Sequence, residues 1–203
     1  MDESTQPAEA PAVVLGLGNP GSEYEGSRHN RGREVVEELA RRRGLQLTSG
    51  DCACRLASGD GFVIGTPETY MNRSGYTARC LRDRLEVEPD AMLIVYDDVA
   101  LPLGALRVRK KGGPGGQKGM ASVIENLRTA EIPRLRLGVA PVAEERALPD
   151  DLVDFVLTGF DGDEAALAAD QIREAADACE YWLEHGTGAT MNRFNATARD
   201  AAV

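Results

Sequence analysis

The sequence predicts a single-domain α/β protein, because short apolar runs typical of strands alternate along the chain with amphipathic segments typical of helices. Its 203 residues are enough for one domain with a full hydrophobic core. Neither an internal repeat nor a linker divides the chain. We expect residues 12–195 to form this domain. Residues 1–11, which are acidic and rich in Pro and Ala, predict a disordered extension, and residues 196–203 predict a flexible tail.

The N-terminal half predicts three strands and two helices. Ala12–Leu17 is a continuous apolar run, the pattern of a strand that is buried on both faces. The turn residues Asn19, Pro20 and Gly21 follow it. Apolar residues at helical spacing predict a helix over Asn30–Arg43 that ends at Gly44. We then expect two strands joined by a hairpin turn, followed by a helix, over Cys52–Ser58, Gly61–Thr66 and Ser74–Leu85.

The C-terminal half predicts three more strands and two more helices. The strands are expected over Met92–Tyr96, Leu101–Arg109 and Arg134–Ala140. The helices are expected over Met120–Arg128 and Asp163–Glu184, and residues from Gly186 onward are expected to be mobile. The type of the short element Leu152–Leu157 stays undecided.

The charge of the chain limits its possible partners. The net charge is −10, which argues against a general nucleic-acid-binding protein. Its distribution is uneven, since residues 104–137 hold eight Lys or Arg against two Glu, and residues 142–180 hold twelve Asp or Glu against two Arg. This polarity leaves one basic face for a phosphate-bearing partner. Because no apolar run reaches the roughly 18–20 residues that span a bilayer and no signal-peptide pattern opens the chain, we expect a cytoplasmic protein without a membrane partner.

Four cysteines are too few for a disulfide framework in a chain of this length. Cys52 and Cys54 lie at alternate positions of a predicted strand, which makes a poor zinc half-site without a second pair. We therefore expect Cys52, Cys54, Cys80 and Cys179 to be reduced and to serve as small apolar residues. No metal site is predicted.

Residues 16–21 match G-x-G-x-x-G, the dinucleotide-binding fingerprint. That fingerprint needs a helix that begins at the glycines, so that its N-terminal amides face the pyrophosphate. Here Pro20 disfavours helical geometry at Asn19, and helical periodicity starts only at Asn30. We therefore predict no NAD site. The glycines are expected to let the backbone and Asn19 approach a ligand closely.

Polar side chains follow three of the predicted strands at the points where those strands end. They are Asn19, Tyr24, Arg28, His29 and Asn30 after the first strand, Asn72 after Gly61–Thr66, and Asp97 and Asp98 after Met92–Tyr96. This set suits general-base catalysis, in which a carboxylate holds one imidazole nitrogen while the other deprotonates water. A magnesium pair or a simple turn is the alternative for the two adjacent aspartates.

Several motifs carry a resemblance to a known family. In chain order they are GLGNPGSEY and SRHNRG, PETYMNRSG, VYDDVALPLG, a GGxxG loop before RLRLG, and GATMNRFN. Their order and spacing resemble bacterial peptidyl-tRNA hydrolases over residues 12–195, nearly the whole chain. The resemblance implies a mixed, twisted central sheet flanked by helices, in a cytoplasmic and usually monomeric enzyme that needs no cofactor. Such enzymes cleave the ester bond between a peptide and tRNA, which frees the tRNA for translation.

The resemblance also implies roles for the matching residues. His29 would be the general base, Asp97 would orient it, and Asn19 would distinguish N-blocked from free aminoacyl-tRNA; these three are the candidate catalytic residues. The candidate residues for binding the substrate or tRNA are Tyr24, Tyr70, Asn72 and Lys118. The residues themselves agree with ester hydrolysis by activated water, because no nucleophile motif such as G-x-S-x-G is present.

The glycine-rich loop Lys110–Gly119 departs from the pattern of the family. The family commonly reads Gly-Gly-His-Asn-Gly, whereas this chain has Gln117 and Lys118 at the third and fourth positions. Gln117 offers an amide that does not titrate near neutral pH, and Lys118 replaces an amide by a cation. We expect hydrolysis to be retained, with altered substrate contacts and stronger attraction to the phosphates that Arg107–Lys118 would meet. The alternative is a non-catalytic RNA-binding relative of the same fold.

Overall fold

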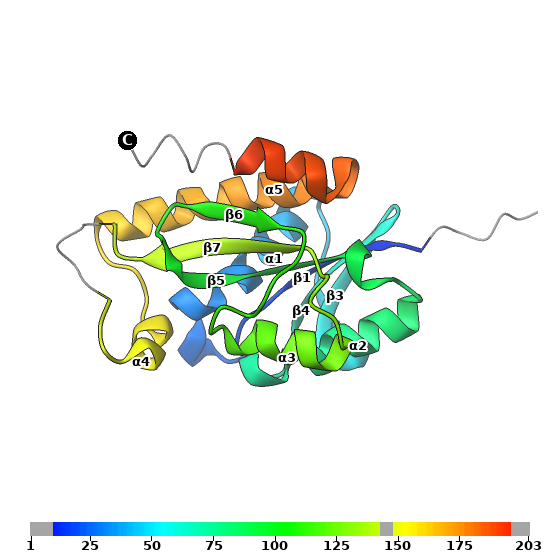
Figure 1. The fold of residues 1–203 in the computed structure, drawn as a ribbon, viewed down its shortest axis with the longest axis horizontal. Helices are drawn as coiled ribbons and strands as arrows, with labels where there is room; N and C mark the ends of the chain where they lie inside the picture. The colour runs from blue at the N-terminus through cyan, green and yellow to red at the C-terminus, as the bar shows by residue number, and fades with distance from the viewer. Residues whose placement is uncertain (1–9, 143–147, 196–203) are drawn as a thin grey trace, which may run out of the picture.

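One mixed sheet of seven strands, with helices on both faces, organises the molecule (Figure 1). The structure is a computed structural model that describes residues 10–142 and 148–195. The strand order is β2-β3-β4-β1-β5-β7-β6. This architecture confirms the predicted α/β class and its mixed central sheet. Most of the predicted extension over residues 1–11 and all of the tail over 196–203 lie outside the described residues, so both stay predictions.

The four central strands of the sheet run parallel to one another, and its two sides are antiparallel. Helices cover these parallel strands on both faces, which is why β1 and the first half of β5 are continuous apolar runs in the sequence. The central strands are β4 (Phe62–Pro67), β1 (Ala12–Gly16), β5 (Met92–Pro102) and β7 (Arg134–Ala140). The outer strands are β2 (Thr48–Gly50), β3 (Cys54–Gly59) and β6 (Leu106–Arg109).

Two helices cover each face of the sheet, and each pair closes its own apolar core. On one face α1 and α5 bury Leu39 and Trp182, and on the other α2 and α3 bury Leu81 and Met120. The helices are α1 (Arg31–Arg42), α2 (Ser74–Leu85), α3 (Lys118–Leu127), α4 (Leu152–Leu157) and α5 (Asp163–Phe194). Among the described residues, no helix combines the length and apolar character needed to cross a membrane.

The strands differ from the prediction at two places. β5 continues to Pro102, so Leu101 belongs to it, and β6 begins only at Leu106. β2 was not predicted, because all of its residues are exposed and no burial pattern marks it. The undecided segment Leu152–Leu157 is the helix α4.

The C-terminal helix is longer than predicted. Gly186 is non-helical, with φ 74°, but α5 resumes beyond it and continues to Phe194, which is buried. The prediction that residues from Gly186 onward are mobile is therefore wrong for those up to Asn195. The Asn195 side chain pairs with the backbone of Val108, through Oδ1 to the amide at 2.8 Å and Nδ2 to the carbonyl at 3.0 Å. A single glycine resembled a helix end in the sequence, whereas tertiary packing carries the helix past it.

Gly16 and Gly32 allow α1 to lie very close to the sheet. A Cβ added at Gly16 would overlap the carbonyl of Gly32, and one added at Gly32 would overlap the carbonyl of Val95. Gly16 therefore serves the packing of α1 on β1, while the close approach of a ligand at these glycines stays a prediction. α1 begins only at Arg31, well after the glycines that resembled a dinucleotide fingerprint.

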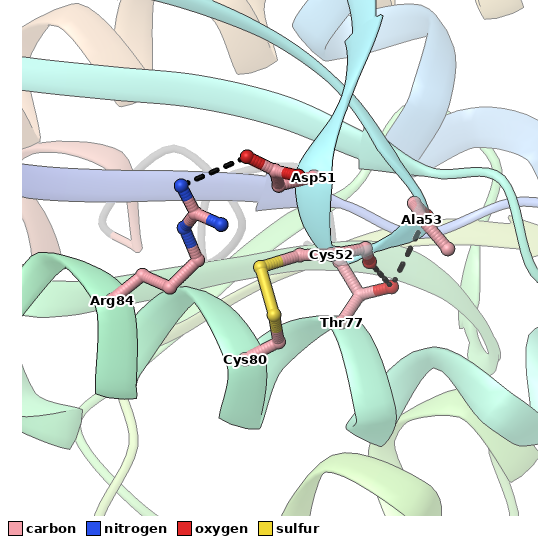
Figure 2. The surroundings of a disulfide bond; sticks show 6 residues. All are labelled: Asp51, Cys52, Ala53, Thr77, Cys80 and Arg84. Atoms are coloured by element: carbon pink, nitrogen blue, oxygen red, sulfur yellow. Dashed lines mark hydrogen bonds and ion pairs between the residues drawn. A yellow bond between two sulfur atoms is a disulfide. The ribbon is translucent and has the colours of Figure 1, made fainter.

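Cys52 and Cys80 form a disulfide, which corrects the prediction that all four cysteines are reduced. The bond joins the 3₁₀ turn η3 (Asp51–Ala53) to α2, as Figure 2 shows. The two Cα atoms are 5.4 Å apart, within the usual range for a disulfide. The Thr77 hydroxyl, on the same helix, donates to the Cys52 carbonyl at 3.0 Å. The two cysteines are 28 positions apart in the sequence, and no sequence spacing indicated their contact.

We expect two of the four cysteines to react as thiols in the unfolded, unreduced protein, because Cys54 and Cys179 are free. In the native protein neither should react, since both are buried and burial raises the pKa of the Cys54 thiol to about 12. Titration with a thiol reagent in denaturant should count two thiols before reduction and four after it, and the same titration without denaturant should count none. A Cys80→Ser variant should expose one additional thiol, that of Cys52. Four reactive thiols without reduction would contradict the disulfide.

Candidate active site

The segments at the carboxyl ends of β1, β4 and β5 surround a cavity of about 350 Å³. Parallel strands bring these ends to one edge of the sheet, where α/β proteins commonly bind ligands. His29 follows β1 in the 3₁₀ turn η2 (Arg28–Asn30), Asn72 follows β4 in the turn η4 (Met71–Arg73), and Asp97 lies on β5. All three line the cavity, so the structure brings together side chains from three strand ends.

His29 and Asp97 form a hydrogen-bonded pair across the ends of β1 and β5. The distance from His29 Nδ1 to Asp97 Oδ2 is 2.9 Å. The carboxylate side chain is 2 % exposed and the imidazole 13 %, so the acceptor is buried while the ring keeps access to the cavity. A carboxylate partner favours the tautomer with the proton on Nδ1, which leaves the Nε2 lone pair of His29 free.

Gln117 holds the other oxygen of the same carboxylate. Its Nε2 donates to Asp97 Oδ1 at 3.0 Å, and its Oε1 accepts from the backbone amide of Met120 at 2.8 Å. Gln117 is therefore the N-cap of α3 and a buried donor to Asp97 at once. Both oxygens of the carboxylate have partners, which fixes the plane of the group that faces His29.

The glycine-rich loop is attached to the protein at both ends. At its start, the buried Arg134 guanidinium donates to the carbonyls of Gly112 and Gly113, at 2.6 and 3.1 Å. At its end, the side chain of Gln117 caps α3. Between these anchors, Gly115 and Gly116 adopt positive φ angles of 60° and 85° and line the cavity. Only glycine takes such angles readily.

Asn19 is oriented by two neighbours. The Asn30 side chain binds both backbone groups of Asn19, accepting from its N–H at 2.7 Å and donating to its carbonyl at 3.0 Å. The side-chain oxygen of Asn19 accepts from the Met71 amide at 2.8 Å. Because that oxygen is occupied, the NH₂ group of Asn19 is the part that remains to donate into the cavity it lines.

Asp98 has a different partner from its neighbour Asp97. Its Oδ2 lies 2.5 Å from Nε of Arg136 on β7, and its Oδ1 accepts from the Ala100 amide at 2.8 Å. Asp98 also lines the cavity, but Arg136 and the Ala100 amide engage both of its carboxylate oxygens. The two carboxylates thus have separate partners, and in the part of the chain that the structure describes no group of three or more His, Cys, Asp or Glu side chains is placed to hold a metal ion.

Arg28 fixes the turn that carries His29. Its side chain is buried between Phe155 and Phe160, with the guanidinium 4.5 Å from each ring centroid. It also donates to the Thr158 hydroxyl at 2.8 Å and pairs with Glu164 at 2.7 Å. Arg28 thus ties η2 to α4 and to the start of α5, and it has a structural role.

The predicted binding residues divide into those at the cavity and one beside it. Tyr70, Asn72 and Lys118 line the cavity, and Tyr70 is 55 % exposed. Tyr24 is not among the lining residues. It packs edge-to-face against Tyr70, with ring centroids 6.4 Å apart, so it supports the wall of the cavity from outside.

One wall of the cavity was missed in the sequence. It consists of apolar side chains of α4, a helix amid acidic residues, and these are Leu152, Val153, Val156 and Leu157. The repeat of apolar pairs four residues apart in this segment is a helical signal. The contact of Gln117 with Asp97 was also missed, because nothing in the sequence specifies which buried group an amide meets.

The comparisons with known proteins agree on one family. The family model described as peptidyl-tRNA hydrolase matches residues 13–202. A peptidyl-tRNA hydrolase of a Synechococcus species is 43 % identical over 94 % of this chain and 86 % of its own length. The peptidyl-tRNA hydrolase of Syntrophomonas wolfei is 37 % identical over 90 % of this chain and 99 % of its own length. The crystal structure of peptidyl-tRNA hydrolase from Acinetobacter baumannii superposes with a TM-score of 0.82 at 30 % identity, covering 92 % of this chain and 95 % of that one.

Proposed function

This chain belongs to the peptidyl-tRNA hydrolase family, and from this membership we propose that it hydrolyses the ester bond between tRNA and a peptide or N-blocked aminoacyl group. The products are the free acid and a tRNA that returns to translation. The observation that carries the proposal is the His29–Asp97 pair on a cavity at the ends of the parallel strands.

The proposed reaction is general-base hydrolysis by water. His29 Nε2 takes a proton from water as the water oxygen attacks the ester carbonyl carbon. When the tetrahedral intermediate collapses, the bond to the ribose oxygen breaks, and the same imidazole returns the proton to that oxygen. Asp97 acts as a positioning residue, since it holds the ring and stabilises the imidazolium that forms in between.

The cavity favours water over a covalent nucleophile. Among the described residues that line it, none is Ser, Thr or Cys. The free thiol of Cys54 lies in the apolar core, where burial raises its pKa, so it is a poor nucleophile. Activated water is therefore the reactant that these side chains support.

Amide groups supply the donors for the developing oxyanion and for the peptide. Asn19 and Asn72 both line the cavity, and neutral amide N–H donors stabilise negative charge that develops in a site shielded from bulk water. Because the orientation of Asn19 is fixed by Asn30 and Met71, we assign to Asn19 the discrimination of N-blocked from free aminoacyl groups.

The two ends of the substrate need different surfaces. The apolar wall of α4 suits the side chains of a variable peptide, while the exposed ammonium of Lys118 suits a phosphate of the tRNA. We further propose that the protein acts in the cytoplasm, as a monomer. Cytoplasmic thiols are normally kept reduced, so the state of the Cys52–Cys80 bond in cells bears directly on that location.

A non-catalytic RNA-binding role is the weaker alternative. It was motivated by Gln117 and Lys118 in place of the usual His and Asn of the family. Gln117 donates to one oxygen of Asp97, and the other oxygen still binds His29. The replacement of the usual His by Gln117 is therefore compatible with the pairing of His29 and Asp97.

Replacing His29 by Ala should lower kcat for N-acetyl-aminoacyl-tRNA by about 10²–10⁴-fold, because the water loses its base. Asp97→Asn should cause a loss of similar order, since an amide no longer fixes the tautomer. The release of the acyl group from tRNA measures both. His185→Ala, at the other histidine of the chain, is the control and should be fully active. Unchanged turnover of His29→Ala would contradict the mechanism.

Replacing Gln117 by Asn should lower kcat by about tenfold with little change in KM. Asn is a favoured N-cap, but its side chain is one methylene shorter and cannot span from the cap to Asp97. Gln117→Leu loses both contacts and should also lose about 1 kcal/mol of stability. Steady-state kinetics measures the role of Gln117 as a donor to Asp97, and urea unfolding measures its role as the N-cap of α3. Gln117→His, which restores the residue common in the family, is compared in both measurements. If Gln117→Asn keeps the wild-type kcat, Gln117 only caps the helix.

A further inference from the structure

We propose that a basic groove between α2 and α3 binds the phosphodiester backbone of the RNA next to the ester, an inference that rests on the proposed function and extends it. The groove has a volume of about 520 Å³ and opens beside the cavity, with Asn72 lining both. Its other charged and aromatic side chains are Arg73, Tyr76, Arg79, Glu125 and Arg128.

The arginines of the groove have no ion-pair partner in residues 10–142 and 148–195. Among the described residues, no carboxylate lies within ion-pair distance of Arg73, Arg79 or Arg128, and all three are exposed. Most other arginines on these surfaces are paired, as Arg84 is with Asp51. In a chain with a net charge of −10, three unpaired guanidinium groups against one carboxylate, that of Glu125, form a local site for an anion.

The backbone holds the two helices at a fixed separation along the groove. A Cβ added at Gly75 on α2 would overlap the carbonyl of Ser122 on α3, and the Gly75 amide donates to the Ser122 hydroxyl at 3.0 Å. Asn126 bonds back to the Ser122 carbonyl at 2.9 Å. The floor of the groove is therefore rigid, and the arginines project from a preformed surface.

The chemistry of the groove favours RNA over a peptide. Helices offer no strand edge to which an extended peptide could add. Guanidinium groups bind phosphates through two parallel hydrogen bonds, and Tyr76, 49 % exposed, provides a face on which a base can stack. A tRNA always carries phosphates, whereas acidic side chains occur only in some peptides. The apolar wall of α4 is left for the peptide.

The length of α3 matches a short run of nucleotides. Lys118, its first residue, lines the cavity, and Arg128, just past its end, lines the groove. Ten helical residues span about 15 Å, comparable to the axial rise of about four stacked nucleotides. Cations at the two ends of α3, Lys118 and Arg128, are therefore spaced to meet phosphates near the ester and farther from it.

The test is equilibrium binding of uncharged tRNA to the Arg73→Gln/Arg79→Gln/Arg128→Gln variant over a range of salt concentrations. Because three phosphate contacts are lost, we expect Kd to rise at least about tenfold and the slope of log K against log salt to fall by about two. Tyr76→Ala should weaken binding about fivefold or more without changing the slope. The control, Arg41→Gln/Arg43→Gln/Arg84→Gln, changes the charge equally at arginines that pair with Glu38, Glu180 and Asp51.

A second substrate separates this inference from the proposed function. Hydrolysis of an N-acetyl-aminoacyl ester of adenosine, which carries no phosphate, should be the same in the groove variant and the wild type. A wild type that binds tRNA but cleaves neither ester would refute the hydrolase, whereas weaker tRNA binding by the groove variant would still support the groove. Equal tRNA binding by the groove variant and the control would overturn the groove. So would a loss confined to esters of acidic peptides, which would assign it to the peptide.

Discussion

The hydrogen bond between His29 and Asp97 depends on the pairing of two strands and on the contacts of the residues around it. The two residues are 68 positions apart, and they meet only because β1 and β5 are adjacent parallel strands. The residues that flank His29 hold it there, since Arg28 is buried against α4 and Asn30 binds the backbone of Asn19. On the other side, Gln117 fixes the carboxylate of Asp97. A base with a fixed partner is the result.

Close packing of the backbone sets the position of that base. α1 starts directly after the turn that carries His29, and it can lie on the sheet only because Gly16 and Gly32 have no side chains. The two adjacent carboxylates at the end of β5 have different partners. Asp98 is neutralised by Arg136, so Asp97 is the carboxylate that faces the imidazole. Apolar side chains of α4 and the cation of Lys118 border the cavity beside this pair.

Much of the fold could be predicted from the sequence, because continuous apolar runs mark β1 and the first half of β5, and alternating basic and apolar residues mark β7. The helix beyond Gly186 could not, since long-range packing of Phe194 and not local preference maintains it. The Cys52–Cys80 bond depends on how η3 lies against α2. The contact between Gln117 and Asp97 depends on where a loop ends relative to a strand, and the sequence contains no such distance.

The protonation of the His29 ring tests the central claim most directly. In ¹⁵N NMR spectra of protein labelled at histidine, the neutral ring should carry its proton on Nδ1 and leave Nε2 bare, because Asp97 accepts at Nδ1. A His185→Gln variant removes the other histidine and leaves the His29 signals alone. Asp97→Asn should shift the ring toward a mixture of tautomers. A neutral wild-type ring protonated on Nε2 would contradict the account, since the bare nitrogen would then be Nδ1, which faces Asp97 and not the water in the cavity.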